Sequence, residues 1–152
     1  MRRPAAVATG VFGLTATEIA ALTTVQIAGL TTQQLSALSG AQTAVFSSAQ
    51  LAALSSQLSG LSATGIAGLS TADLASLSTI QIRGFTATQL ASLTTTDVGA
   101  LDPSQLLALT ITQVAALIDT QIGVLSTSQL AALQATQLAA LSTAGISGLS
   151  VT

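Results

Sequence analysis

The segment "LTTVQIAGLTTQQLSA", residues 22–37, contains nearly the same eight residues twice in succession. Each half supplies a leucine, two threonines, a glutamine and an aliphatic residue in the same order, with Leu22, Thr23, Gln26 and Ile27 returning as Leu30, Thr31, Gln34 and Leu35. An interval of eight residues matches neither the period of an α-helix nor that of a β-strand. A chain built from this segment must therefore interrupt its secondary structure once in every repeat.

The same octad continues along the chain from Leu14 onward. Position 1 is always Leu or Phe, position 2 is usually Ser or Thr, position 5 is usually Gln, and position 6 is aliphatic except at Thr43. The consensus is L-[ST]-T-x-Q-[IL]-A-[AG]. We expect an N-terminal extension over residues 1–13 and a single octapeptide-repeat array over residues 14–152, with about 17 units and one seven-residue unit at 54–60.

Neither regular element survives if it runs on without a break. In one continuous helix, eight residues turn the chain about 80° past two full turns, so that no face stays buried. In one continuous strand, positions 1 and 6 point to opposite faces. The repeat itself must therefore contain the signals that start and end a short element.

The spacing of Ser/Thr and Gln within each octad supplies a helix start. A hydroxyl at position 2 and a glutamine three residues later form the spacing of a capping box, and the apolar residues at positions 1 and 6 form a hydrophobic staple. The pairs Thr23–Gln26 and Thr31–Gln34 are predicted as structural caps of this kind. At the other end, a small residue such as Gly29 at position 8 predicts a left-handed C-cap.

The unit "LDPSQLLA", residues 101–108, supports short helices most strongly. Asp102 replaces Ser/Thr at the N-cap, where Asp is a preferred residue. Pro103 follows at the first helical position, where proline is favoured, and Gln105 completes the capping box. Within a β-ladder the same proline would be confined to an edge or a corner.

So short a helix is not stable alone and must stack on its neighbours. The sequence therefore predicts an all-α solenoid of very short capped helices, one per octad, around a continuous apolar seam. The seam includes Leu22, Ile27, Leu30, Leu35, Phe46, Phe85, Leu101 and Leu106. A β-solenoid with Thr and Gln ladders and stacked Leu and Ile is the alternative architecture.

Composition excludes many kinds of chemistry. The chain has no Cys and no His, three basic residues and five acidic ones. Its hydroxyls lack a base to activate them, and its thin charge gives no field to attract nucleic acid. Asp97 and Asp102 lie close in sequence, but two carboxylates make a poor calcium site. We therefore expect no enzyme, no cofactor, no metal, no nucleic-acid partner and, without an apolar run of about 18 residues, no transmembrane span.

The octads resemble the "LTTAQIAAL"-type arrays of large bacterial secreted or surface proteins that are described as adhesin-like. The resemblance covers residues 14–152. It implies a structural or display segment outside the bacterial cell or at its surface, and it carries over no catalytic residue.

Two functions are compatible with the repetition. The first is a stalk, spacer or self-associating filament at a bacterial cell surface, associating end to end or laterally. The second is a recognition module that presents a Thr/Ser array to ice, glycan or a protein partner. The second requires a flat, even threonine spacing, which favours the β-solenoid. The sequence identifies no surface partner.

Overall fold

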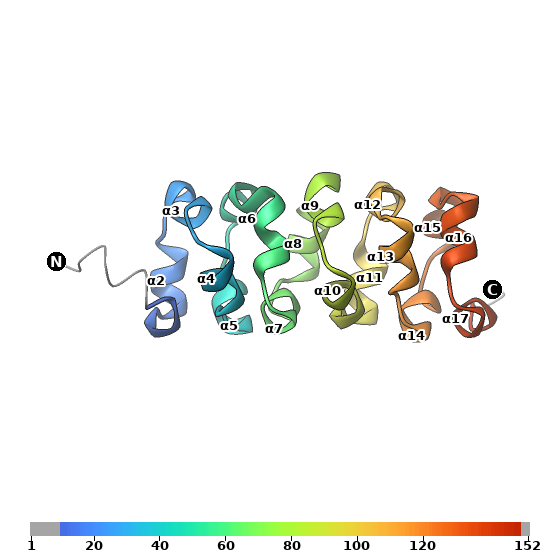
Figure 1. The fold of residues 1–152 in the computed structure, drawn as a ribbon, viewed down its shortest axis with the longest axis horizontal. Coiled ribbons are helices and arrows are strands. Elements are labelled where there is room, and N and C mark those ends of the chain that lie inside the picture. The colour runs from blue at the N-terminus through green and yellow to red at the C-terminus, as the bar shows by residue number, and fades with distance from the viewer. Residues whose placement is uncertain (1–9, 150–152) are drawn as a thin grey trace.

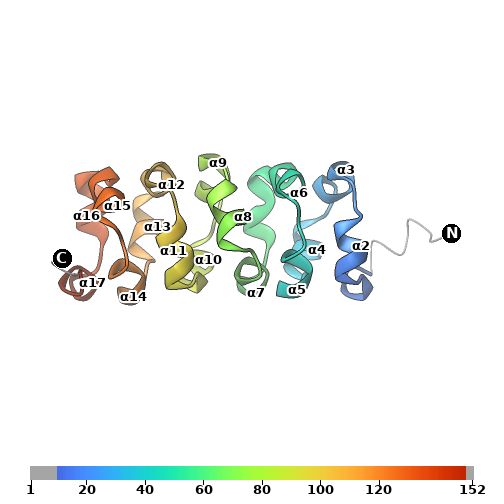
Figure 2. The same cartoon turned by 180° about the vertical axis from the view of Figure 1, so that it is seen from behind.

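The computed structural model describes residues 10–149 as a row of short helices that wind into a solenoid (Figure 1). Within these residues there are 16 short α-helices and no strand. The row is elongated, and the first and last helices lie at opposite ends of it in both views (Figure 2). The predicted all-α solenoid is confirmed, and the β-solenoid is absent from the described part of the chain.

The helices follow one another at intervals of about one octad. In chain order they are η1 (Val11–Gly13), α2 (Ala16–Ala20), α3 (Thr24–Ala28), α4 (Thr32–Ser36), α5 (Gly40–Thr43), α6 (Ser48–Leu54), η2 (Ser55–Gly60), α7 (Ala63–Ala67), α8 (Thr71–Ser76), α9 (Thr79–Arg83), α10 (Ala87–Ser92), α11 (Thr95–Ala100), α12 (Pro103–Ala108), α13 (Ile111–Ala115), α14 (Asp119–Ile122), α15 (Thr127–Ala132), α16 (Ala135–Ala140) and α17 (Thr143–Ser147).

Each α-helix starts because position 2 has an extended backbone and, in most units, a hydroxyl that caps the next residues. At α3, Thr23 Oγ1 accepts from the backbone N–H of Gln26 at 3.2 Å, and Gln26 Oε1 accepts from the N–H of Thr23 at 2.8 Å. The same pair of bonds joins Thr31 and Gln34 at α4. These two reciprocal bonds satisfy two of the N–H groups that a helix start leaves without partners.

The helix ends differ from the prediction. Gly29 has φ −82° and Gly84 has φ −74°, both right-handed, and no described glycine has a positive φ. The predicted left-handed C-cap is therefore wrong. The chain leaves the helix through the position-1 leucine, whose N–H bonds to the position-6 carbonyl, as Leu30 does to Ile27 at 3.1 Å. This leucine turns to extended backbone (Leu77, φ −65°, ψ 139°), so no left-handed residue is needed.

Three units make one coil, because each helix packs against the helix three units further along. The contacts α3 with α6, α9 with α12, and α12 with α15 show this period. The three-unit period continues through the seven-residue unit at 54–60. Its helix η2 contacts α4, three units earlier, and α9, three units later, as a full helix in its place would. Ser55, at φ 42° the one described non-glycine residue with a positive φ, takes up the missing residue at the junction of α6 and η2.

Positions 1 and 6 form the core. The seam residues Ile27, Leu35 and Leu106 at position 6 have no exposed surface. At position 1, Leu22 in the first coil is only partly buried, whereas the other predicted seam residues are buried: Leu30, Phe46, Phe85 and Leu101.

The core begins before Leu14. Val11, which lies in the stretch predicted as an N-terminal extension, is buried in the same apolar cluster. It stands eight residues before Ile19 and therefore takes the place of position 6 in a preceding unit. Residues 1–9 lie outside the described part of the chain.

Two coils come unusually close between α5 and α7. A Cβ on Gly68 would overlap the carbonyl oxygen and Cα of Gly40 and the hydroxyl of Thr43. Most of these atoms belong to the backbone and cannot rotate away. This contact between coils therefore requires glycine at position 68 for its lack of a side chain, since the backbone there is right-handed.

Gly68→Ala is expected to lower the free energy of unfolding by about 2 kcal/mol, as overpacking of a tight contact does. Gly99→Ala is the matched control, because nothing lies within 4 Å of its added Cβ and alanine favours the helix there by about 0.5–1 kcal/mol. Urea denaturation followed by circular dichroism measures both. Equal midpoints for the two variants would contradict the close contact.

Candidate functional site

The most regular set of buried polar side chains in the described residues is a row of glutamines at position 5, which lies between successive coils. We call these residues the glutamine row. Its members are Gln42, Gln50, Gln81, Gln89, Gln105, Gln113, Gln121, Gln129 and Gln137. A buried amide needs partners for both its oxygen and its nitrogen, since an unpaired polar group inside a protein is costly.

Each amide of the row bonds in two directions. In Gln89, Oε1 accepts from the N–H of Thr86 at 2.8 Å and so caps its own helix. Its Nε2 donates to the carbonyl oxygens of Leu58 at 2.9 Å and Leu61 at 2.6 Å, which precede it by 31 and 28 residues. These carbonyls belong to the preceding coil. One side chain thus caps the start of its own helix and also bonds that helix to the preceding coil.

The spacing of residues in the octad predicts only the first of these roles. Gln105, predicted as the capping partner of Asp102, accepts from its N–H at 2.8 Å and also donates to Leu74 and Leu77 one coil earlier at 2.9 and 2.7 Å. The sequence did hold a signal for the second role. Glu completes a capping box as well as Gln does, so the choice of Gln in most units indicates that the amide N–H₂ donates to another acceptor.

Gly65 and Gly145 replace the glutamine in two units, and another pair of groups then links the coils. At Gly65, the hydroxyl of Thr43 donates to the Gly65 carbonyl at 2.7 Å. This bond explains why Thr43 stands at the one position 6 that is not aliphatic. At the unit of Gly145, the Ser142 hydroxyl donates to Asp119 on the preceding coil.

Asp73 and Asp97 replace the glutamine in two further units. Their carboxylates keep the cap: Asp97 Oδ2 accepts from the Thr94 N–H at 2.9 Å, and Asp73 Oδ2 from the Ser70 N–H at 3.0 Å. A carboxylate has no N–H to give to the coil below. Among residues 10–149, no three His, Cys, Asp or Glu side chains gather in a way that could hold a metal ion.

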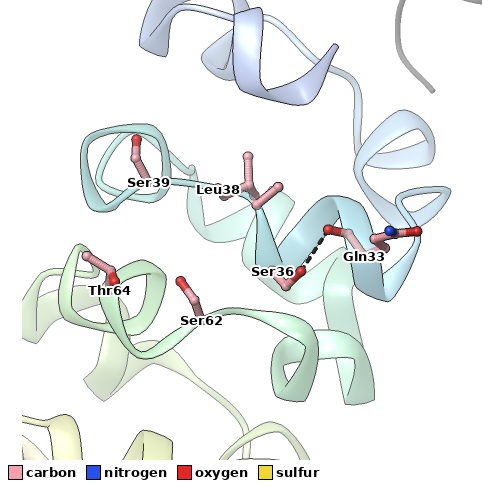
Figure 3. A pocket seen from close by; sticks show the side chains of 7 residues that line it. Gln33, Ser36, Leu38, Ser39, Ser62 and Thr64 are labelled. Carbon is pink, nitrogen blue, oxygen red and sulfur yellow. Dashed lines mark hydrogen bonds between the residues drawn. The ribbon is translucent and has the colours of Figure 1, made fainter. Parts of the chain in front are cut away.

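A pocket of about 620 Å³ lies between α4, α5 and α7 (Figure 3). The seven residues that line it are Gln33, Ser36, Ala37, Leu38, Ser39, Ser62 and Thr64. Ser36 Oγ donates to the backbone oxygen of Gln33 at 2.8 Å, and Ser39 and Ser62 use their hydroxyls as helix caps. No lining residue titrates near neutral pH, so the pocket offers neutral hydrogen bonding and no acid–base chemistry.

Asp102 caps its helix differently from the threonines. Its carboxylate accepts from the N–H of Ser104 at 3.0 Å and from the Ser104 hydroxyl at 2.9 Å, one residue earlier than a capping box requires. Pro103 occupies the first helical position and has no N–H to offer. The hydrogen bonds from the Ser104 backbone and then its side chain lower the pKa of Asp102 from its ordinary value of 3.8.

Gln89→Glu is expected to destabilise the chain by on the order of 3 kcal/mol at pH 7, because a buried carboxylate would face two carbonyls that lose their donor. Burial would raise its folded-state pKa, so the loss shrinks as the pH falls and the protonated acid donates again. Gln26→Glu is the control: Gln26 is exposed and its described bonds only cap the helix, so it should change stability by less than about 0.5 kcal/mol. Denaturant unfolding of both at pH 7 and pH 4 tests the row, and equal losses would refute it.

Asp102→Asn is expected to remove a pH dependence. Because folding lowers the pKa of Asp102, its ionised form adds stability above the unfolded-state pKa, and this is lost as the pH falls through the folded pKa. Asparagine caps equally well without titrating. Thermal midpoints should therefore fall further between pH 7 and pH 2 for the parent than for the variant. Equal decreases in the two proteins would contradict a lowered pKa of Asp102 in the folded state.

A comparison with protein-family models finds a repeat family that matches part of the chain. Residues 66–103 match the model of a family described as the ALTTAQ repeat, and the six letters of that name correspond to position 8 followed by positions 1–5 of the octad. No curated protein and no solved structure matches the chain. Of the helices in the described residues, none has both the length and the apolar character to cross a bilayer. The chain is thus similar to the ALTTAQ repeat over residues 66–103.

Proposed function

We propose that this chain is a structural repeat module that acts as a stalk or spacer at a bacterial cell surface. The observation that carries the proposal is the glutamine row, which bonds coils to the coil before them along most of the array, with the Thr43–Gly65 bond linking the coils between Gln50 and Gln81. These bonds position one coil on the next and do not act on a substrate. Repeating them along the chain produces an elongated array. The chemistry of the described residues supports a mechanical role in preference to a catalytic one.

The contacts favour a spacer because they are local along the array. Each helix packs against the helix three units before and after it, so every coil meets only its immediate neighbours. In such arrays stability is approximately a sum of coil and interface contributions, and length grows with the number of repeats. The elongated shape follows from this addition (Figures 1 and 2).

The surface location rests on the resemblance of the octads to arrays of bacterial secreted and surface proteins. The chain has no cysteine, which permits this location without favouring it. Its coils are held by amide hydrogen bonds and aliphatic packing, which oxidation does not alter. The array is therefore suited to an oxidising exterior.

A Thr/Ser recognition array has less support. Most hydroxyls at position 2 already accept from backbone N–H groups, as at Thr23, Thr31 and Thr86. The flat threonine spacing that such a role requires is favoured by a β-solenoid, and residues 10–149 contain no strand.

Duplication of one complete coil, residues 85–108, tests the spacer. Small-angle X-ray scattering of the dilute chain should give the profile of an elongated particle, with a maximum dimension that rises by one constant step for each added coil. The helical circular-dichroism signal per residue should stay unchanged, because the added coil repeats an existing interface. A maximum dimension that does not grow with added coils would refute the proposal.

A further inference from the structure

The unit of Gly65 lacks the side chain that lies between the coils in most other units. At position 5, where the glutamine row stands, Gly65 in α7 offers only its backbone. A Cβ built on Gly65 would lie 3.5 Å from the Leu38 carbonyl oxygen and 3.5 Å from Ser62 Oγ, which are ordinary van der Waals distances. A side chain therefore has room to begin here.

The pocket of about 620 Å³ continues from this empty position. Leu38 and Ser62, which face the missing Cβ of Gly65, are both lining residues of the pocket. Figure 3 shows Leu38 on the segment between α4 and α5, and Ser62 on the segment that leads into α7. The pocket thus opens between successive coils, where the row glutamines lie elsewhere in the array.

A row glutamine uses three groups of the surrounding backbone, as Gln89 shows. Its amide oxygen accepts from the N–H of Thr86, the N-cap residue of its own helix, at 2.8 Å. Its amide nitrogen donates to the carbonyls of Leu58 and Leu61 in the preceding coil at 2.9 and 2.6 Å. One donor and two acceptors therefore surround the amide.

The unit of Gly65 contains the same three backbone groups without the amide. By position in the repeat, the N–H belongs to Ser62 and the two carbonyls belong to Leu35 and Leu38. The Leu35 carbonyl accepts from the Leu38 N–H at 3.1 Å, and a carbonyl oxygen has a second lone pair. Among residues 10–149, no hydrogen bond uses the Ser62 N–H or the Leu38 carbonyl.

We propose that this pocket binds a primary carboxamide, the group carried by glutamine and asparagine side chains and by small free amides. The carboxamide oxygen accepts from the Ser62 N–H, and its nitrogen donates to the carbonyls of Leu35 and Leu38. These are the bonds that Gln89 makes within its own chain. The site does not depend on the spacer proposal, which concerns the length of the array.

The three backbone groups select a carboxamide over charged ligands. A carboxylate has no N–H to give to the two carbonyls, and an ammonium or guanidinium group has no acceptor for the Ser62 N–H. The lining residues carry no formal charge, so they do not compensate the desolvation of a charged ligand. A neutral amide satisfies all three groups at once.

The other glycine at position 5 does not form such a site. A Cβ built on Gly145 would lie 2.6 Å from Ile122 Cδ1 and 2.8 Å from Ile122 Cβ, so the isoleucine side chain fills the space. Loss of the glutamine therefore does not leave a pocket by itself. The space at Gly65 is open because no side chain of the preceding coil comes so near.

Propionamide is the probe, because its atoms correspond to a glutamine side chain from Cβ to the amide. Titrated into the isotope-labelled chain, it should shift the backbone N–H signal of Ser62 in the NMR spectrum, with saturation in the millimolar range expected of so small a ligand. Propionate and N,N-dimethylpropionamide, which has no N–H, should leave the signal in place. A signal that does not move to saturation with propionamide, or that moves equally with either control compound, would overturn the proposal.

Gly65→Ala tests where the amide lies. The added methyl group fits and takes the place of the terminal carbon of propionamide, which should therefore bind about tenfold more weakly. Acetamide is one carbon shorter and should bind the variant and the parent equally. Gly99→Ala is the matched control, since nothing lies within 4 Å of its added Cβ, and it should bind both compounds like the parent. Equal loss of both compounds, or of neither, in Gly65→Ala would contradict the placement.

Gly65→Gln supplies the amide from the chain itself. It should abolish the binding of both compounds and raise the urea midpoint, whereas retained binding in a variant with the parent's circular-dichroism spectrum would refute the site. Competition with N-acetylglutamine N-methylamide distinguishes the two sources of the carboxamide. Displacement of propionamide indicates a glutamine side chain of a peptide, and binding of propionamide alone indicates a small free amide.

Discussion

Most of the array depends on a side-chain amide that caps its own helix and bonds to the preceding coil at the same time. A helix of five or six residues has too few internal bonds to be stable alone, and a coil of three such helices exposes its carbonyls to the next coil. The glutamine at position 5 addresses both deficits, because its oxygen accepts from the helix start and its nitrogen donates to the coil below, as in Gln89. Aliphatic packing supplies most of the stabilisation, and the amide fixes where one coil lies on another.

The local structure was readable from the sequence because its signals are local. Capping spacing, the Asp102–Pro103 helix start and the alternation of apolar and polar positions each act within a few residues, and together they predict short capped helices. The helix ends were misread for a related reason. Gly29 and Gly84 resemble left-handed caps, but both are right-handed. The chain can leave a helix through an extended position-1 residue instead, as it does at Leu77.

The coil-to-coil relation was not readable, because it depends on contacts about 28–31 residues apart. No octad states how many units complete a coil. The need for an amide at position 5 hinted at a second acceptor without saying where it lies. The exceptions were even less readable: Thr43 looks like a polar defect in the seam until Gly65 is seen to lie above it, and Gly68 looks dispensable until Gly40 is found against it.

These matched exceptions limit how the array can change in length. Wherever the octads are interchangeable, a unit gained or lost leaves the pattern intact, since each helix simply meets whichever unit lies three places away. Between Gly40 and Gly68 this freedom is lost. An octad inserted there would place Thr43 under the wrong partner and bring a side chain against the Gly40 backbone. The number of octads is therefore expected to vary in the stretches where neighbouring octads are interchangeable. Between Gly40 and Gly68 the number of octads should stay constant.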